Sequence, residues 1–186
     1  ILADDLGWGD LSCYGSETIS TPHIDSLAQG GLLMRNAYAT SATSSPSRYA
    51  MFTGMYPWRV DVHILPGDAP LLIPTDMATM PKMFQEEGYR TAAIGKWHLG
   101  MGDGFTDWNR PVVPAANTVG FDYTNIIPAT VDRVPPVYVE NGRVVGLDPS
   151  DPIQVSYEKP FPGEETAISN PEKDNYVYVL VPLRSA

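Results

Sequence analysis

The sequence predicts an α/β fold in which residues suited to catalysis lie where strands end and where one helix begins. Short apolar runs of strand length alternate with segments that carry helix-start and helix-stop signals. Polar residues follow directly after two of these runs, at Asp4-Asp5 and at Lys96-x-His98. The chain has 186 residues, of which 43% are hydrophobic, and this is enough for one domain with a buried core.

The composition limits the classes of partner. Twelve basic residues against 22 acidic ones give a formal charge of −10, which argues against a nucleic-acid partner because phosphate backbones require a basic face. A local basic cluster can still bind a small anion inside an acidic protein. Cys13 is the only cysteine, so neither an intramolecular disulfide nor a cysteine zinc cluster can form. No apolar run reaches transmembrane length, and we expect no membrane partner.

The N-terminal residues combine a short strand with two acids. Residues 1–3 are apolar and predict the end of a buried strand, which Asp4 and Asp5 follow in a loop that contains glycines. Two adjacent carboxylates repel, so their burial together requires a cation or protonation. Their oxygen atoms suit Ca²⁺ or Mg²⁺. Taken alone, such a pair more often forms a solvated acidic turn.

The next segment predicts a helix and a second strand. Thr21 is expected to cap a short helix, Pro22 suits its first position, and the glycines at 30–31 end it. Residues 32–39 then predict a strand that leads towards Ser44.

A second helix is predicted from Ser44 to Gly54. The fixed φ of Pro46 suits a first turn, Ser44 lies at or near the N-cap, and Gly54 suits the end. A helix start gathers unpaired N–H groups and therefore favours an anion. Arg48 follows Ser44 by four residues, a spacing that can bring both side chains to one side of the helix. No G-x-S-x-G elbow surrounds Ser44, which argues against a Ser-His-Asp hydrolase.

A third helix and a buried strand precede the second group of polar residues. Residues 79–88 carry helix signals and residues 91–94 a strand pattern. In an extended chain Lys96 and His98 share a face while Trp97 points away. An ammonium group and an imidazole on one face can hold an oxyanion and protonate a leaving oxygen. Each residue alone is more often solvated or structural than catalytic.

Two further strand patterns follow. Asn141-Gly142 between β-branched residues predicts a hairpin with a type I′ turn. Residues 176–181 alternate in part and predict a strand.

Two motifs resemble the signatures of the type I, formylglycine-dependent sulfatases. Ser44-x-Pro46-x-Arg48, followed by Thr53-Gly54, is similar to the first signature. The segment Gly88-Tyr89-x-Thr91-x-x-x-Gly95-Lys96-x-His98 is similar to the second. Two independent signatures in the family's order argue against coincidence. The resemblance is clearest over residues 1–150, and residues 122–152 loosely resemble bacterial arylsulfatases that act on sulfated polysaccharides.

The resemblance implies a role for each candidate residue. Ser44 would be oxidised by a formylglycine-maturation enzyme, and one hydroxyl of the hydrated aldehyde would attack the sulfur of a sulfate ester. Asp4, Asp5 and the modified Ser44 would bind Ca²⁺. Arg48 and Lys96 would neutralise the sulfate, and His98 would contact the formylglycine hydroxyl and handle its proton.

The resemblance also implies the fold and the extent of the domain. The fold would be alkaline-phosphatase-like, with a mixed, mostly parallel sheet and helices on both faces. Residues 1–186 would form the N-terminal portion of a single sulfatase catalytic domain, and thus an incomplete fold. In the family a later Asp-Asn pair completes the metal site; Asp174-Asn175 comes too early and lacks the expected glycine-rich surroundings. A serine precursor implies a bacterial protein in the periplasm or outside the cell.

We therefore predict a sulfuric ester hydrolase that acts on an aryl or carbohydrate sulfate. A phosphomonoester or phosphonate hydrolase of the same superfamily and a non-catalytic truncated fragment are the alternatives. The motifs favour sulfate over phosphate esters. The missing downstream ligands favour the inactive fragment for this chain by itself.

Overall fold

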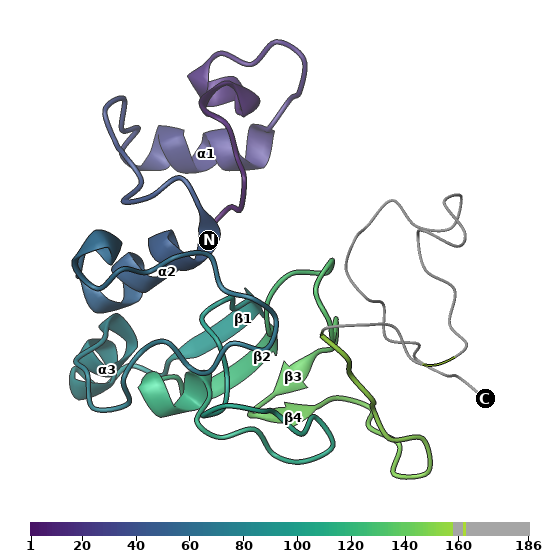
Figure 1. The fold of residues 1–186 in the computed structure, drawn as a ribbon. Coiled ribbons are helices and arrows are strands. Elements are labelled where there is room, and N and C mark those ends of the chain that lie inside the picture. Colours follow the sequence, from purple (N-terminus) through teal and green to yellow (C-terminus); the bar gives the residue numbers. More distant parts are fainter. Residues whose placement is uncertain (158–161, 163–186) are drawn as a thin grey trace. The chain divides into compact units, whose positions relative to one another are not determined.

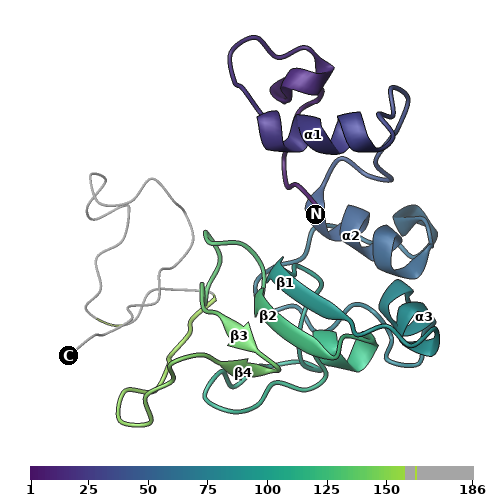
Figure 2. The ribbon, with the colours of Figure 1, turned by 180° about the vertical axis from the view of Figure 1, so that it is seen from behind.

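The computed structural model describes residues 1–157 and residue 162, and they divide into two units (Figures 1 and 2). The first unit comprises residues 1–39, and the second begins at Thr40. The strand expected at residues 176–181 and the pair Asp174-Asn175 lie outside the described residues. Among the helices that the structure describes, none is both long and apolar enough to cross a membrane.

The first unit consists of the 3₁₀ helices η1 (Trp8–Asp10) and η2 (Ser12–Tyr14) and the helix α1 (Pro22–Gly30). α1 begins at a proline and ends at a glycine, as the sequence predicted. The strands predicted at residues 1–3 and 32–39 are wrong, because this fully described unit contains no strand. Strand backbone requires a neighbouring strand to pair its N–H and C=O groups, and an apolar pattern alone does not provide one.

Asp25 ties η2 to the start of α1. Its carboxylate accepts hydrogen bonds from the Ser12 hydroxyl at 2.6 Å and from the Cys13 N–H at 2.9 Å. The Thr21 hydroxyl donates to Asp25 at 2.9 Å and does not cap α1. The expected side-chain cap is therefore wrong, because the Thr21 Oγ1 accepts a hydrogen bond from the Ser12 N–H at 3.0 Å and none from the first turn of α1.

The second unit contains a mixed sheet of four strands in the order β1-β2-β3-β4. Its strands are β1 (Ala92–Lys96), β2 (Tyr123–Ile127), β3 (Val139–Glu140) and β4 (Arg143–Val144). β1 and β2 are parallel, so Lys96 pairs with Ile127 at their carboxyl ends. β3 is antiparallel to β2 and to β4.

The turn between β3 and β4 confirms the predicted hairpin. Asn141 and Gly142 have φ values of 47° and 79°. A type I′ turn requires positive φ at both central positions.

Two helices lie beside the sheet and next to each other (Figures 1 and 2). α2 (Ser44–Thr53) ends at Gly54, whose left-handed conformation lets its N–H donate to the Ala50 carbonyl. α3 (Met80–Glu86) begins after Thr79. Both confirm the helices predicted from the sequence. The remaining elements, η3 (Pro57–Arg59) and η4 (Ala116–Val119), are single 3₁₀ turns.

The core fixes α2 against the end of β1. Trp97, Leu99, Ile126 and Val139 are fully buried. Phe52, on the last turn of α2, stacks on Trp97 with ring centroids 5.7 Å apart. Because Trp97 lies between Lys96 and His98 in sequence, this aromatic contact couples the helix that carries Ser44 to the segment that carries the second motif.

Candidate active site

Ser44 and Arg48 meet at the start of α2. Ser44 is the half-buried first residue of the helix, and Arg48 lies one turn later with 7% of its surface exposed. The Arg48 Nε donates to the Ser44 Oγ at 3.2 Å, and its Nη1 donates to the Lys96 carbonyl at 2.6 Å. The guanidinium therefore links the first motif to the second.

The backbone at Lys96 and His98 differs from the extended chain that the sequence predicted. Lys96 is the half-buried last residue of β1. The chain then leaves the strand, and His98 has a left-handed φ of 56°. The chain is therefore not extended through His98, as the sequence had led us to expect. Left-handed backbone is costly for a non-glycine residue and persists only where the surroundings enforce it, often at functional sites.

The imidazole of His98 is almost completely enclosed, with 1% of the residue exposed. Its Nε2 lies 3.0 Å from the Leu65 carbonyl and 2.8 Å from the Arg133 Nη1. Its Nδ1 is buried and has no hydrogen-bond partner among the described residues. An unpaired buried polar atom is costly, so Nδ1 is a natural contact point for a ligand.

Burial is the main cause that lowers the pKa of His98 below its ordinary value. The nearby Leu65 carbonyl oxygen opposes this shift because it favours a protonated ring, whereas the charges of Lys96, Arg133 and Arg48 lower the pKa further. A histidine with a lowered pKa is neutral at pH 7. His98 can therefore donate a proton from one ring nitrogen and accept a hydrogen bond at the other.

Leu65 joins three parts of this site. Its N–H donates to the Oγ of Ser45, a fully buried residue on α2, at 3.1 Å. Its carbonyl oxygen accepts a hydrogen bond from Arg133 and faces His98. Two residues later, a Cβ on Gly67 would lie 2.7 Å from the Val134 carbonyl. Glycine is thus needed for the close approach of these two loops.

Arg133 was not predicted from the sequence. It lies in a turn after β2, where its N–H donates to the Thr130 carbonyl at 3.1 Å, and it belongs to neither motif. A basic residue near prolines is a weak signal, and its contact with His98 spans 35 residues.

The site gathers positive charge in a protein of net charge −10. Arg48, Lys96 and Arg133 are all close enough to His98 to lower its pKa. Arg133 and Lys96 also help to lower the pKa of Asp132, for which the neighbouring Thr130 hydroxyl is the larger cause. With the start of α2 nearby, the cluster favours a bound anion.

Asp4 and Asp5 belong to the first unit. Both are exposed, and Asp5 has a left-handed φ of 57°. Their oxygens are the right type of ligand for Ca²⁺, which takes about six to eight of them. The described part of the chain holds no group of three or more His, Cys, Asp or Glu residues that could form a metal site. The two aspartates thus fit part of a calcium site and not a complete one.

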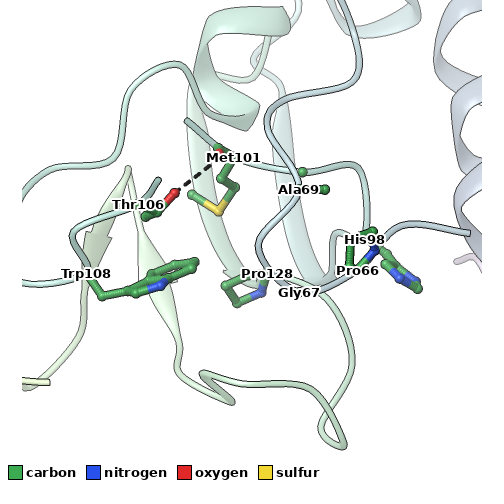
Figure 3. Close-up of a pocket in the computed structure, with 9 residues that line it drawn as sticks. Pro66, Gly67, Ala69, His98, Met101, Thr106, Trp108 and Pro128 are labelled. Atoms are coloured by element: carbon green, nitrogen blue, oxygen red, sulfur yellow. Dashed lines mark hydrogen bonds between the residues drawn. The ribbon is translucent and has the colours of Figure 1, made fainter. Parts of the chain in front are cut away.

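A hollow behind His98 is not the substrate site. It is lined mainly by loop residues and core side chains, including Pro66, Ala69, Met101, Trp108 and Pro128 (Figure 3). It has no room for a water molecule, and Ser44, Arg48 and Lys96 do not line it. The hollow is a small gap where loop and core side chains pack beside the imidazole.

Comparison with known proteins identifies the family. The sulfatase family profile matches residues 1–135. The chain belongs to the sulfatase family. This confirms the resemblance found in the two motifs, and the mixed sheet agrees with the alkaline-phosphatase-like fold of sulfatase structures.

Individual relatives give the same result. The N-acetylgalactosamine-6-O-sulfatase of Bacteroides thetaiotaomicron is 58% identical over 174 residues, which cover 92% of this chain and 34% of the relative. Human steryl-sulfatase is 47% identical over 109 residues, covering 54% of this chain and 18% of the relative. A solved structure from work on glycosaminoglycan metabolism by B. thetaiotaomicron is 58% identical, with a TM-score of 0.86, over 91% of this chain and 36% of that one. The chain thus spans about a third of the length of its B. thetaiotaomicron relatives.

Proposed function

We propose that this chain provides the nucleophile half of the active site of a sulfuric ester hydrolase. The observation that carries the proposal is the convergence of Ser44, Arg48 and His98 with the carboxyl end of β1 in a positively charged site. These residues come from two sequence motifs that resemble the sulfatase signatures, and membership of the family supports their roles.

We propose a carbohydrate sulfate as the substrate, in particular a 6-O-sulfated N-acetylamino sugar. The support is the identity of 58% to a protein named N-acetylgalactosamine-6-O-sulfatase. The charge of the site suits the sulfate group, while the residues that would select the sugar are expected in the part of the relatives that this chain does not cover.

We propose that Ser44 is changed before it acts. A serine hydroxyl is a weak nucleophile without an activating base or metal, and the Arg48 Nε beside the Ser44 Oγ is a donor that cannot remove its proton. Oxidation to formylglycine by a maturation enzyme would give an aldehyde, and addition of water to this aldehyde would supply a diol. Arg48 would then orient the oxygen at position 44 and, with Lys96, balance the charge of the sulfate.

His98 would exchange a proton with the diol, because burial and nearby cations keep its imidazole neutral. Asp4, Asp5 and the modified Ser44 would hold Ca²⁺, which when bound polarises oxygens of the sulfate and the diol. The two aspartates supply only part of the Ca²⁺ ligands, and we propose that the remaining ligands come from a longer protein. Residues 1–186 would form the N-terminal portion of one catalytic domain of that protein. A location in the periplasm or outside the cell stays a prediction.

Turnover by the full-length protein tests the proposal. We expect hydrolysis of an aryl sulfate and of N-acetylgalactosamine 6-sulfate, with much weaker hydrolysis of the matching aryl phosphate. Ser44→Ala serves as the control and should abolish turnover, since alanine cannot be converted to formylglycine. A clear preference for the phosphate would instead assign the chain to the phosphomonoester or phosphonate hydrolases.

A further inference from the structure

The hydrogen bonds around His98 contain a conflict that only one ring tautomer resolves. Nε2 lies 3.0 Å from the Leu65 carbonyl oxygen, which accepts, and 2.8 Å from the Arg133 Nη1, which donates. A neutral imidazole nitrogen either carries a proton or presents a lone pair. Nε2 therefore cannot bond to both neighbours in the same way, and its state depends on which neighbour prevails.

The chemistry of Arg133 decides between the two states. A guanidinium remains protonated and has no acceptor atom. A proton on Nε2 would face an N–H of Arg133 at 2.8 Å, which places two donors against each other. Arg133 also donates to the Leu65 carbonyl, so this oxygen keeps a hydrogen-bond donor when Nε2 carries no proton. The contact between Arg133 and Nε2 therefore decides in favour of a lone pair on Nε2, because a guanidinium can only donate.

A lone pair on Nε2 places the single proton of the neutral ring on Nδ1. This nitrogen is buried and has no partner among the described residues. The charges of Lys96, Arg48 and Arg133 oppose a second proton on the ring. The neighbouring Asp132 stays ionised, because the Thr130 hydroxyl and then the charges of Arg133 and Lys96 lower the pKa of its carboxyl group. The imidazole thus offers one N–H donor, at the nitrogen that has no hydrogen-bond partner in the described part of the chain.

We propose that Arg133 is a positioning residue that fixes His98 in the tautomer protonated at Nδ1, so that this N–H is the group offered to an oxygen of the substrate or the nucleophile. The catalytic consequence rests on the proposed function, whereas the tautomer itself does not. Arg133 acts through His98, and its turn is fixed by contacts of its own, from the Arg133 N–H to Thr130 and between Gly67 and the Val134 carbonyl.

Nitrogen NMR of the full-length protein labelled with ¹⁵N-histidine tests the tautomer directly. Two-bond proton–nitrogen correlations distinguish a ring protonated at Nδ1 from one protonated at Nε2, and His98→Asn identifies the signal of His98. We expect the Nδ1-protonated pattern at neutral pH in the unaltered protein. The Nε2-protonated pattern would overturn the proposal without any need for a variant.

Arg133→Met removes the donor and frees the Leu65 carbonyl, so the proton is expected to move to Nε2. Arg133→Lys keeps a cationic donor and should retain the Nδ1 pattern. Arg110→Met is the matched control, since the Arg110 side chain is 81% exposed and pairs with Asp107 at 3.3 Å. An Arg133→Met spectrum identical to that of the control would overturn the proposal.

Turnover then connects the tautomer to the reaction. With an aryl sulfate we expect Arg133→Met to lower kcat about 10- to 100-fold. General acid–base catalysis accelerates a reaction about 10²–10⁴-fold, and part of this acceleration is lost when the proton lies on the wrong nitrogen. Arg133→Lys should recover most of this loss. A shifted tautomer with unchanged kcat would refute the catalytic role. Absence of sulfatase activity in the unaltered protein would refute the proposed function and leave the tautomer assignment standing.

Discussion

Replacing Arg48 with lysine tests whether the guanidinium fork assembles the site. Arg48 uses two different nitrogens, Nε to the Ser44 Oγ at 3.2 Å and Nη1 to the Lys96 carbonyl at 2.6 Å. An ammonium group is a compact point charge and cannot reproduce a planar fork that spans two directions. Arg48→Lys therefore keeps the charge and loses at least one of the two hydrogen bonds.

The expected magnitude follows from the burial of these bonds. A hydrogen bond to a charged group contributes about 1.5–3 kcal/mol, and Arg48 is only 7% exposed, so little water is available to replace it. We expect the free energy of unfolding to fall by about 1.5–3 kcal/mol. If the same bond orients the nucleophile in the transition state, kcat/KM for an aryl sulfate falls about 10- to 150-fold.

Urea unfolding and steady-state kinetics of the full-length protein provide the assay. Arg90→Lys is the matched control: the Arg90 side chain is 92% exposed and its ion pair with Asp122 has a separation of 3.6 Å. Such exposed pairs contribute about 0–1 kcal/mol, so this variant should behave like the unaltered protein. If Arg48→Lys and Arg90→Lys gave equal stability and equal kcat/KM, the reasoning would be refuted.

The remaining predictions concern histidine titration, backbone strain and the metal. The pKa of His98 is lowered in the folded state from an ordinary value of 6.5, so the unfolded state binds a proton more readily. The free energy of unfolding should therefore fall as the pH drops below about 6.5. Urea unfolding should show a smaller fall for His98→Asn. Gly100→Ala should cost about 2–5 kcal/mol in thermal unfolding, because φ is +73° and a Cβ would lie 1.9 Å from the Pro70 carbonyl oxygen, whereas Gly146→Ala, with φ +71° and open space, should cost about 1–2 kcal/mol. With formylglycine confirmed at position 44, residues 1–186 alone should bind Ca²⁺ weakly in a calorimetric titration and show no turnover. The reason is that the described aspartates supply too few oxygen ligands. Tight binding with sustained turnover would mean that residues of this chain complete the site.

Local signals in the sequence predicted the elements that local physics determines. Pro46 lies in the first turn of α2, Gly54 follows its last residue, and the helical repeat brings Arg48 back to Ser44. Positive φ at Asn141 and Gly142 produces the predicted hairpin turn. In each case the residues that give the signal are the ones that form the structure.

Features that depend on distant partners could not be predicted in this way. The strands expected at residues 1–3 and 32–39 failed because an apolar pattern does not specify a pairing neighbour. His98 has a left-handed φ, and its backbone N–H bonds to the carbonyl of Pro128, which follows β2 and lies 30 residues later in the sequence. Arg133 joins His98 only through the tertiary structure.

The most direct test of the central claim is the mass of the peptide that contains Ser44 in an active preparation of the full-length protein. If sulfate ester hydrolysis depends on formylglycine, protein made with a serine-type maturation system should show this peptide short of two hydrogens, with the loss located at Ser44. An unmodified Ser44 in a preparation that turns over an aryl sulfate would contradict the account.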